Sequence, residues 1–200
     1  MKFTEITEKE YEKYWENHPL KTFMSAPKIA KLREKTNWKA YFVGVKDNKK
    51  LIGAAMLLSH KRKFNVNEFY SPRGFLLDYN NKELLTFFVE KVKEFAKSKN
   101  GYILRIDPYV IYKQRDINGD IVDGGEDNTH VVDHLTSLGF KKVKTENMEQ
   151  VGWMFSLGLE GKTEEQILKE MKPNTRNTIR KAEKLGITMT ELSYEELDRF

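Results

Sequence analysis

Four cations recur every four residues near the C-terminal end of the sequence: Lys172, Arg176, Arg180 and Lys184. On a helix they would form one stripe, and like charges at this spacing destabilise a helix by ~0.2–0.5 kcal/mol per pair. RNA would offset that cost, because Lys and Arg contacts to phosphates supply most of the sequence-independent affinity for nucleic acid. The alternative is a solvated face, eased by Glu183 beside Arg180.

A carboxylate with catalytic potential follows a short apolar segment. Asp107 comes directly after residues 102–106, which predict a short buried strand, and Pro108 prevents the strand from continuing. Open sheets bind ligands beyond the carboxyl ends of their strands, and a carboxylate there can orient or deprotonate an amine. By spacing alone, a turn cap onto the following amides is the simpler interpretation.

Two other segments combine cations with aromatic rings. Lys35 and Trp38 flank a predicted helix-to-strand junction, where a cation can hold a phosphate and an indole can pack on a sugar or base. Tyr70 and Arg73 lie beside Gly74, whose missing side chain allows close backbone approach. For Lys35 and Trp38, the sequence alone favours the simpler interpretation, a strand start beside a solvated lysine. A plain tight turn explains Gly74 equally well.

The composition limits the class of protein. With 39% hydrophobic residues, the 200-residue chain can bury a core for one domain or for one domain plus part of another. The net charge of +5 suits contact with nucleic acid or an anionic membrane without requiring it. The absence of cysteine excludes disulfides, thiolate nucleophiles and Cys-ligated zinc, and it is compatible with a reducing cytoplasm.

Targeting and metal signals are weak. The N-terminus lacks the apolar core of a signal peptide, and the longest apolar run, residues 51–58, is too short to span a bilayer. We therefore expect a soluble cytoplasmic protein without a transmembrane segment. His130 and His134 lie one helical turn apart, but no third ligand has suitable spacing, so no metal site is expected.

Periodicity and turn residues predict a mixed α/β or α+β domain, in which helices cover a mixed sheet. Helices are expected near residues 8–17, 25–36, 81–98 and 131–138, with one or two more over 163–185. Strands are expected at 41–45, 51–58, 64–70, 102–106, 140–144, 151–159 and 187–192. Residues 113–128, rich in Asp, Asn and Gly, predict a long surface loop.

Several segments, in order, resemble landmarks of the Fem family of peptidoglycan-bridge aminoacyltransferases. The resemblance covers the whole chain, and its strength lies in the ordered set. The matching segments are Met1-Lys2-Phe3-Thr4, Phe69 to Gly74, Tyr102 to Tyr109, the apolar run Trp153 to Leu159, the cap Thr163-Glu164-Glu165, the basic segment Lys172 to Lys184, and Ser193 to Leu197.

The resemblance implies a GNAT-like N-acyltransferase fold that occurs twice in tandem. Residues 1–150 would form the first subdomain, and residues 151–200 would begin a second, truncated one. The remaining catalytic apparatus would then lie outside this chain.

The resemblance also assigns roles to the candidate residues. Asp107 would be catalytic, steering or deprotonating the accepting amine, and Tyr102 would border the muropeptide site with it. Lys35 would contact the nucleotide diphosphate of the precursor, with Trp38 in the same cleft. Tyr70 and Arg73 would border the substrate. The four cations of the basic segment would bind tRNA.

The activity implied is non-ribosomal aminoacyl transfer that builds the interpeptide bridge. An amino acid of the Gly, Ala or Ser class would pass from aminoacyl-tRNA to the stem-peptide amine of a lipid-linked or UDP-linked peptidoglycan precursor, with peripheral contact to the inner membrane face. The motif that cradles acetyl-CoA in GNAT enzymes, Arg or Gln followed by x-x-G-x-Gly or Ala, is missing, so no cofactor is expected. The alternatives are a CoA-dependent N-acyltransferase with an atypical loop and a non-catalytic RNA-binding fragment.

Overall fold

The computed structural model describes residues 1–193 and 195–196. The chain divides into two compact units, Met1–Gly152 and Trp153–Phe200, and each is described by itself. Tyr194 and Leu197, which belong to the last of the family-like segments, lie outside the described residues.

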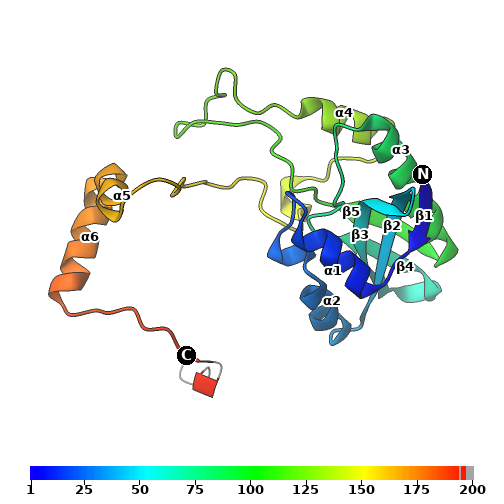
Figure 1. The fold of residues 1–200 in the computed structure, drawn as a ribbon, viewed down its shortest axis with the longest axis horizontal. Helices are drawn as coiled ribbons and strands as arrows, with labels where there is room; N and C mark the ends of the chain where they lie inside the picture. The colour runs from blue at the N-terminus through cyan, green and yellow to red at the C-terminus, as the bar shows by residue number, and fades with distance from the viewer. Residues whose placement is uncertain (194, 197–200) are drawn as a thin grey trace. The chain divides into compact units, whose positions relative to one another are not determined.

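Unit 1 is built on a five-stranded mixed sheet in the order β1-β2-β3-β4-β5 (Figure 1). The strands are β1 (Lys2–Glu5), β2 (Trp38–Asp47), β3 (Lys50–Lys61), β4 (Asn67–Ser71) and β5 (Gly101–Ile106). The first four pair antiparallel, whereas β4 and β5 are parallel. The mixed sheet with flanking helices confirms the predicted fold class.

Helices cover both faces of the sheet. One face carries α1 (Glu8–Glu16) and α2 (Pro27–Glu34), and the other carries α3 (Lys82–Ser98) and α4 (Thr129–Ser137). Successive side chains of β3 point to opposite faces of the sheet. Met56 and Leu58 pack toward α1 and α2, and Ala55 and Leu57 pack toward α3. Burial of both faces explains why this strand reads as a continuous apolar run.

The N-termini of α1 and α2 carry the residues that favour a helix start. The Thr7 hydroxyl accepts a hydrogen bond from the Glu10 amide at 3.1 Å, and the Glu10 carboxylate accepts one from the Thr7 amide at 3.0 Å, which confirms the expected capping box at α1. Hydrogen bonds from Lys46 and Thr7 lower the pKa of Glu10 to about 2. Pro27 occupies the first position of α2, as expected.

The amphipathic pattern of α3 is confirmed. The helix buries Leu84, Leu85, Phe88, Val92 and Phe95 against the sheet. It thereby supplies the largest helical contribution to the core on that face.

Two strand predictions need correction at their ends. The third strand was expected from residue 64 but β4 begins at Asn67, because Phe64 and Asn65 take left-handed φ values of 61° and 59° in a short 3-10 turn, Lys63–Asn65. Residues 102–106 do form β5, but Tyr102 and Ile103 are exposed rather than buried. The reason is that β5 is an edge strand among the residues described.

Three predicted strands, 140–144, 151–159 and 187–192, are absent from the described structure. A strand is stable only when a neighbour completes its hydrogen-bond ladder. Residues 153, 155, 157 and 159 alternate as a strand requires, yet their apolar side chains are exposed and no neighbouring strand pairs with them in the described part of unit 2. In residues 140–144, Phe140 packs on the core while the lysines face solvent.

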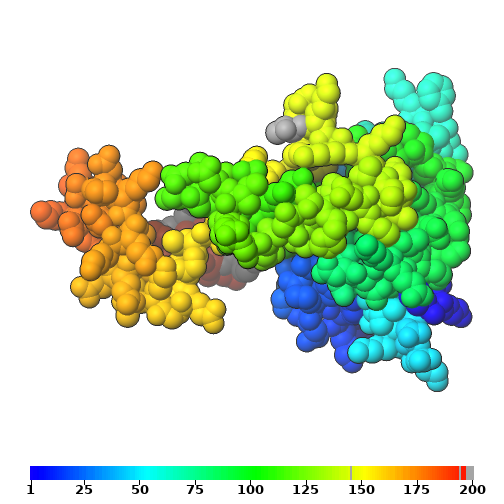
Figure 2. All heavy atoms as spheres, turned by 90° about the horizontal axis from the view of Figure 1, so that it is seen from above, coloured from blue at the N-terminus to red at the C-terminus, as the bar shows by residue number. Residues whose placement is uncertain are grey.

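The expected surface loop over 113–128 is confirmed, with two isolated bridges, Lys113 to Asp127 and Arg115 to Ile121, as its only strand-like pairing within the described range. Figure 2 shows the green stretch that includes this loop extending away from the body of unit 1. An ion pair of 3.2 Å between Lys113 and Asp127 closes its base.

The described part of unit 2 contains two α-helices, α5 (Glu164–Glu170) and α6 (Pro173–Lys184). A capping box between Thr163 and Gln166 starts α5, at the cap that the family resemblance implies, and Pro173 starts α6. Of the one or two helices expected around Pro173, the structure has two. The helix bounds thus match the expected division around Pro173. None of the helices described in either unit is long and apolar enough to cross a bilayer.

The segment after β4 continues alongside β3. Leu76 exchanges two backbone hydrogen bonds of 2.9 Å with Ala54. The buried Tyr79 hydroxyl accepts a hydrogen bond from the Phe75 amide at 2.6 Å and donates one to the Phe75 carbonyl at 3.0 Å. These contacts fix the backbone next to Arg73.

We predict that Tyr79→Phe lowers the free energy of unfolding by about 1–3 kcal/mol, because it leaves the buried amide and carbonyl of Phe75 without this hydrogen-bond partner. Urea unfolding measures the change. The control is Tyr112→Phe, which removes a hydroxyl from an exposed side chain and should alter stability little. Equal effects in the two variants would contradict the role given to the Tyr79 hydroxyl.

Candidate functional site

The candidate site lies where β4 and β5 end. Ser71 pairs with Ile106 in the parallel ladder, so the residues that follow these two strands emerge at the same edge of the sheet. Arg73 follows β4 and Asp107 follows β5. The expected position of Asp107, directly after a strand, is confirmed.

Two donors hold the Asp107 carboxylate. The Tyr70 hydroxyl donates to Oδ2 at 3.0 Å, and the Arg73 backbone amide donates to Oδ1 at 2.7 Å. The Arg73 side chain is a looser partner, with Nε 4.0 Å from Oδ2. Three residues named from the sequence, Tyr70, Arg73 and Asp107, therefore meet in one cluster.

Burial sets the electrostatics of this cluster. Desolvation raises the pKa of Asp107 above its ordinary value, although hydrogen bonds from the Arg73 amide and the Tyr70 hydroxyl act in the opposite direction. Burial also raises the pKa of Tyr70, and the negative charge of Asp107 adds to that shift. Asp107 is thus a better proton acceptor than a surface aspartate, and Tyr70 remains a hydrogen-bond donor.

The turn between Ser71 and Gly74 shapes one wall of the site. Arg73 has a left-handed φ of 50°, and its guanidinium carbon lies 5.6 Å from the centre of the Tyr109 ring. A Cβ atom at Gly74 would lie 2.2 Å from the Ser71 Oγ, so only glycine fits this close approach. The Ser71 hydroxyl is buried, and it has no hydrogen-bond partner within the described structure.

Some neighbours of the site had no clear signal in the sequence. Arg105 forms an ion pair of 2.9 Å with Glu149, and the Gln150 side chain lowers the pKa of Tyr70, against the larger effect of burial. Glu149 and Gln150 are more than forty residues from either strand end, and nothing in their local pattern marks them. Tyr109, by contrast, follows Asp107 by two positions in a segment that the sequence had already singled out.

Other predicted site residues lie outside this cluster. Lys35 is exposed at the C-terminal cap of α2. Trp38 begins β2, packs on His60 with ring centres 4.9 Å apart, and borders the same apolar cluster as Tyr70. Tyr102 is exposed near the start of β5, about 16 Å along the strand from Asp107 at ~3.3 Å per residue.

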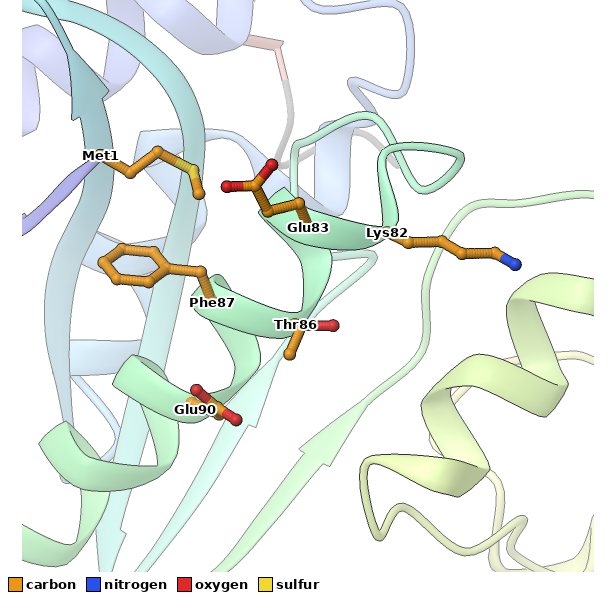
Figure 3. Close-up of a pocket in the computed structure, with 6 residues that line it drawn as sticks. All are labelled: Met1, Lys82, Glu83, Thr86, Phe87 and Glu90. Atoms are coloured by element: carbon orange, nitrogen blue, oxygen red, sulfur yellow. The ribbon is translucent and has the colours of Figure 1, made fainter.

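A separate surface hollow of about 420 Å³ lies beside α3 (Figure 3). Its walls are formed by Met1, Lys82, Glu83, Thr86, Phe87 and Glu90. It contains none of the predicted site residues. The side chains of Glu83 and Glu90 also make it a poor place for an anionic substrate.

The cationic stripe falls on α6, and its members differ in their contacts. Lys172 caps the helix, and Lys172, Arg180 and Lys184 are exposed. Arg176 is half-buried, and its guanidinium donates to the carbonyls of Lys169 and Met171 at 2.7 and 3.0 Å. Arg176 therefore also stabilises the junction between α5 and α6.

The histidine pair has ordinary partners. His130 Nε2 contacts the Asn80 side-chain oxygen at 2.7 Å, and His134 Nε2 contacts the Thr86 hydroxyl at 3.0 Å. Among the residues that the structure describes, no group of three or more His, Cys, Asp or Glu side chains is placed to hold a metal ion.

Comparison with known proteins identifies the family. The model of the FemAB family matches residues 6–200. The chain belongs to the FemAB family. It is 31% identical over its whole length to the aminoacyltransferase FemA of Staphylococcus epidermidis and, separately, to that of Staphylococcus aureus, covering 49% of each relative. A crystal structure of FemX matches all of the chain with a TM-score of 0.76 and 26% identity, over 48% of the FemX chain.

This FemAB-family chain spans about half the length of the curated relatives it matches. The comparisons confirm the family resemblance and the fold class. They assign no role to individual residues, so the site described above depends on its own geometry.

We predict that Asp107→Asn changes how stability depends on pH. Because the folded pKa of Asp107 is raised, the folded state holds this proton more tightly, and stability is lost as pH rises from about 4 through the folded pKa. The variant removes that loss, so its unfolding temperature relative to the parent should increase between pH 4 and pH 7.

The matched control is Asp116→Asn, since backbone hydrogen bonds lower the pKa of Asp116. The Asp116 carboxylate contributes stability at pH values above its unfolded pKa, and this contribution is lost as the pH falls. The unfolding temperature of Asp116→Asn relative to the parent should therefore decrease, not increase, between pH 4 and pH 7. Parallel pH profiles for the two variants would contradict the assignment at Asp107.

Proposed function

We propose that this protein is an aminoacyltransferase that moves an amino acid from aminoacyl-tRNA to the stem-peptide amine of a peptidoglycan precursor, building the interpeptide bridge. Membership of the FemAB family and the names of the FemA relatives support the reaction class. The observation that carries the proposal is the desolvated Asp107 carboxylate, held by Tyr70 and the Arg73 amide at the edge of the sheet.

The chemistry needs little more than positioning and proton transfer. The acceptor amine attacks the ester carbonyl of the aminoacyl-tRNA, so that an amide C–N bond forms and the ester C–O bond to the tRNA breaks. Asp107 accepts the proton that the amine loses and passes it to the departing ribose oxygen, so the carboxylate is regenerated and the protons balance. A general base of this kind accelerates such a step by roughly 10²–10⁴-fold.

Tyr70 and Arg73 act on Asp107 in this proposal. Their donated hydrogen bonds fix the orientation of the carboxylate toward the acceptor. The Arg73 guanidinium also supplies positive charge beside the place where an anionic part of the precursor would lie. Its side chain is only 13% exposed, which limits competition from water.

Lys35, Trp38 and Tyr102 belong to the acceptor-binding part of the proposal. Lys35 is exposed, and no ion pair engages it within the described structure, so its charge is available to a nucleotide diphosphate. Trp38 offers an aromatic face on the same side of the sheet as Tyr70. The exposed Tyr102 ring would contact a more distant portion of the precursor.

The proposal includes no cofactor, because the aminoacyl ester is already an activated donor. It places the reaction in the cytoplasm, with peripheral contact to the inner membrane face if the acceptor is lipid-linked. The transferred residue would be of the Gly, Ala or Ser class. The cations of α6 would bind the tRNA phosphates.

The deciding experiment supplies the protein with a tRNA that carries a labelled amino acid and with a UDP-linked or lipid-linked muropeptide. We expect label in the muropeptide and a loss of at least about a hundredfold in turnover for Asp107→Asn, with its fold retained. Acetyl transfer from acetyl-CoA under the same conditions would support the CoA-dependent alternative instead. Unchanged turnover in Asp107→Asn would remove this residue from catalysis.

For the donor, we predict that replacing Lys172, Arg180 and Lys184 together by Gln weakens tRNA binding and lowers its salt dependence. Each lost phosphate contact reduces the slope of log affinity against log salt by about 0.7–0.9, so the triple variant should lose roughly two units. Helix propensity stays nearly constant, and thermal unfolding should not change appreciably.

Arg176 is left in place in this variant because it bonds the backbone of the α5–α6 junction. The matched control is a triple change of Lys49, Lys50 and Lys82, exposed lysines of unit 1, which removes the same charge. A salt slope that falls equally in both triple variants would show that net charge, not the stripe, attracts the tRNA.

A further inference from the structure

The turn between β3 and β4 presents an aromatic ring to solvent. Phe64 lies at the tip of this turn and is 96% exposed, in a protein whose other phenylalanines of unit 1 mostly pack in the core. Its φ of 61° and the φ of 59° at Asn65 are left-handed values, which residues with a Cβ atom disfavour. Folding alone gains nothing from an exposed ring in this conformation.

The base of the turn is firmly anchored. The Arg62 amide donates to the Val66 carbonyl at 2.8 Å and closes the loop. The Arg62 guanidinium holds the buried Glu68 carboxylate in a two-pronged contact of 2.9 and 2.8 Å. The Phe64 ring is therefore displayed on a rigid support.

The turn carries unpaired positive charge. Lys61 and Lys63 flank the tip, both are exposed, and neither forms an ion pair with any residue that the structure describes. No acidic residue occurs between His60 and Asn67, and the nearest one, Glu68, is neutralised by Arg62. We name this element, Lys61 to Asn65, the Phe64 tip.

We propose that the Phe64 tip docks on an anionic lipid bilayer. An aromatic ring flanked by lysines matches the interface of such a membrane, because the ring enters the boundary between headgroups and acyl chains while the ammonium groups remain at the lipid phosphates. The inference deepens the peripheral membrane contact of the proposed function by naming the surface that makes it. It can fail or hold independently of the transfer reaction, since docking requires no substrate.

The shape of the tip favours a membrane over RNA. Proteins that stack single-stranded bases do so in a positively charged groove that follows the backbone. The Phe64 tip is convex, with its ring almost fully exposed and without another aromatic side chain in the turn. A flat, deformable lipid surface accommodates such a projection.

The fold supplies a matched control at the other end of β3. The turn between β2 and β3 contains Lys49 and Lys50, both exposed, with left-handed φ at Asn48 and Lys49, but no aromatic residue. Replacing Lys49 and Lys50 removes the same charge as replacing the two lysines of the Phe64 tip, and Asp47 directly precedes this turn. Comparing the two turns therefore separates a specific site from a general effect of net charge.

The test measures co-sedimentation of the full chain with vesicles of equal parts phosphatidylglycerol and phosphatidylcholine, against vesicles of phosphatidylcholine alone. We expect binding to the anionic vesicles. Replacing Lys61 and Lys63 together by Gln should reduce the partition coefficient about 25-fold, at roughly fivefold per lysine. Phe64→Asn should reduce it about tenfold, and replacing Lys49 and Lys50 by Gln should change it less than twofold.

Asn is chosen at position 64 because it tolerates the left-handed conformation, so the turn should survive the change. Unfolding temperatures should match the parent in all variants. Three results would overturn the proposal: no binding of the parent chain to anionic vesicles, equal losses in the two double-lysine variants, or tip variants that lose tRNA binding while vesicle binding is retained.

Discussion

The parallel pairing of β4 with β5 is the constraint on which the candidate site depends. Antiparallel strands would send their carboxyl ends to opposite edges of the sheet, whereas the register of Ser71 with Ile106 brings both to one edge. Tyr70 and Arg73 then meet Asp107 from a segment 34 residues or more away in sequence. The Tyr79 contact to Phe75 and the bridge between Leu76 and Ala54 hold the chain that follows β4, which keeps the Arg73 amide aimed at the carboxylate.

The same cluster shows how a carboxylate is kept reactive yet ordered. Burial raises the pKa of Asp107, whereas full solvation would leave it an ordinary weak base. Two donated hydrogen bonds stabilise the ionised form without cancelling the desolvation, so the pKa remains raised while the orientation is fixed. Gly74 makes this arrangement possible, because any side chain at that position would collide with Ser71.

The exposed cations, unlike the Asp107 cluster, have few partners within the fold. On α6, like charges one turn apart repel one another, and Arg176 donates a hydrogen bond to the Lys169 carbonyl. At the Phe64 tip, Lys61 and Lys63 flank a ring that contributes nothing to the core. Neither set of exposed cations adds to the stability of the fold, and the partners proposed for them are tRNA phosphates for α6 and an anionic bilayer for the Phe64 tip.

Local sequence determined the parts of this protein that depend on near neighbours. Capping boxes at Thr7 and Thr163, the amphipathic pattern of α3 and the hairpin of β2 and β3 follow from side chains within a few positions, and Asp107 was placed correctly after its strand. Only tertiary structure decided what needs distant partners. Residues 151–159 have the alternation of a strand but no ladder in the described structure, and Glu149 and Gln150 reach the site without any local signal. The raised pKa of Asp107 likewise arises from burial, a property of the folded chain that its own segment does not encode.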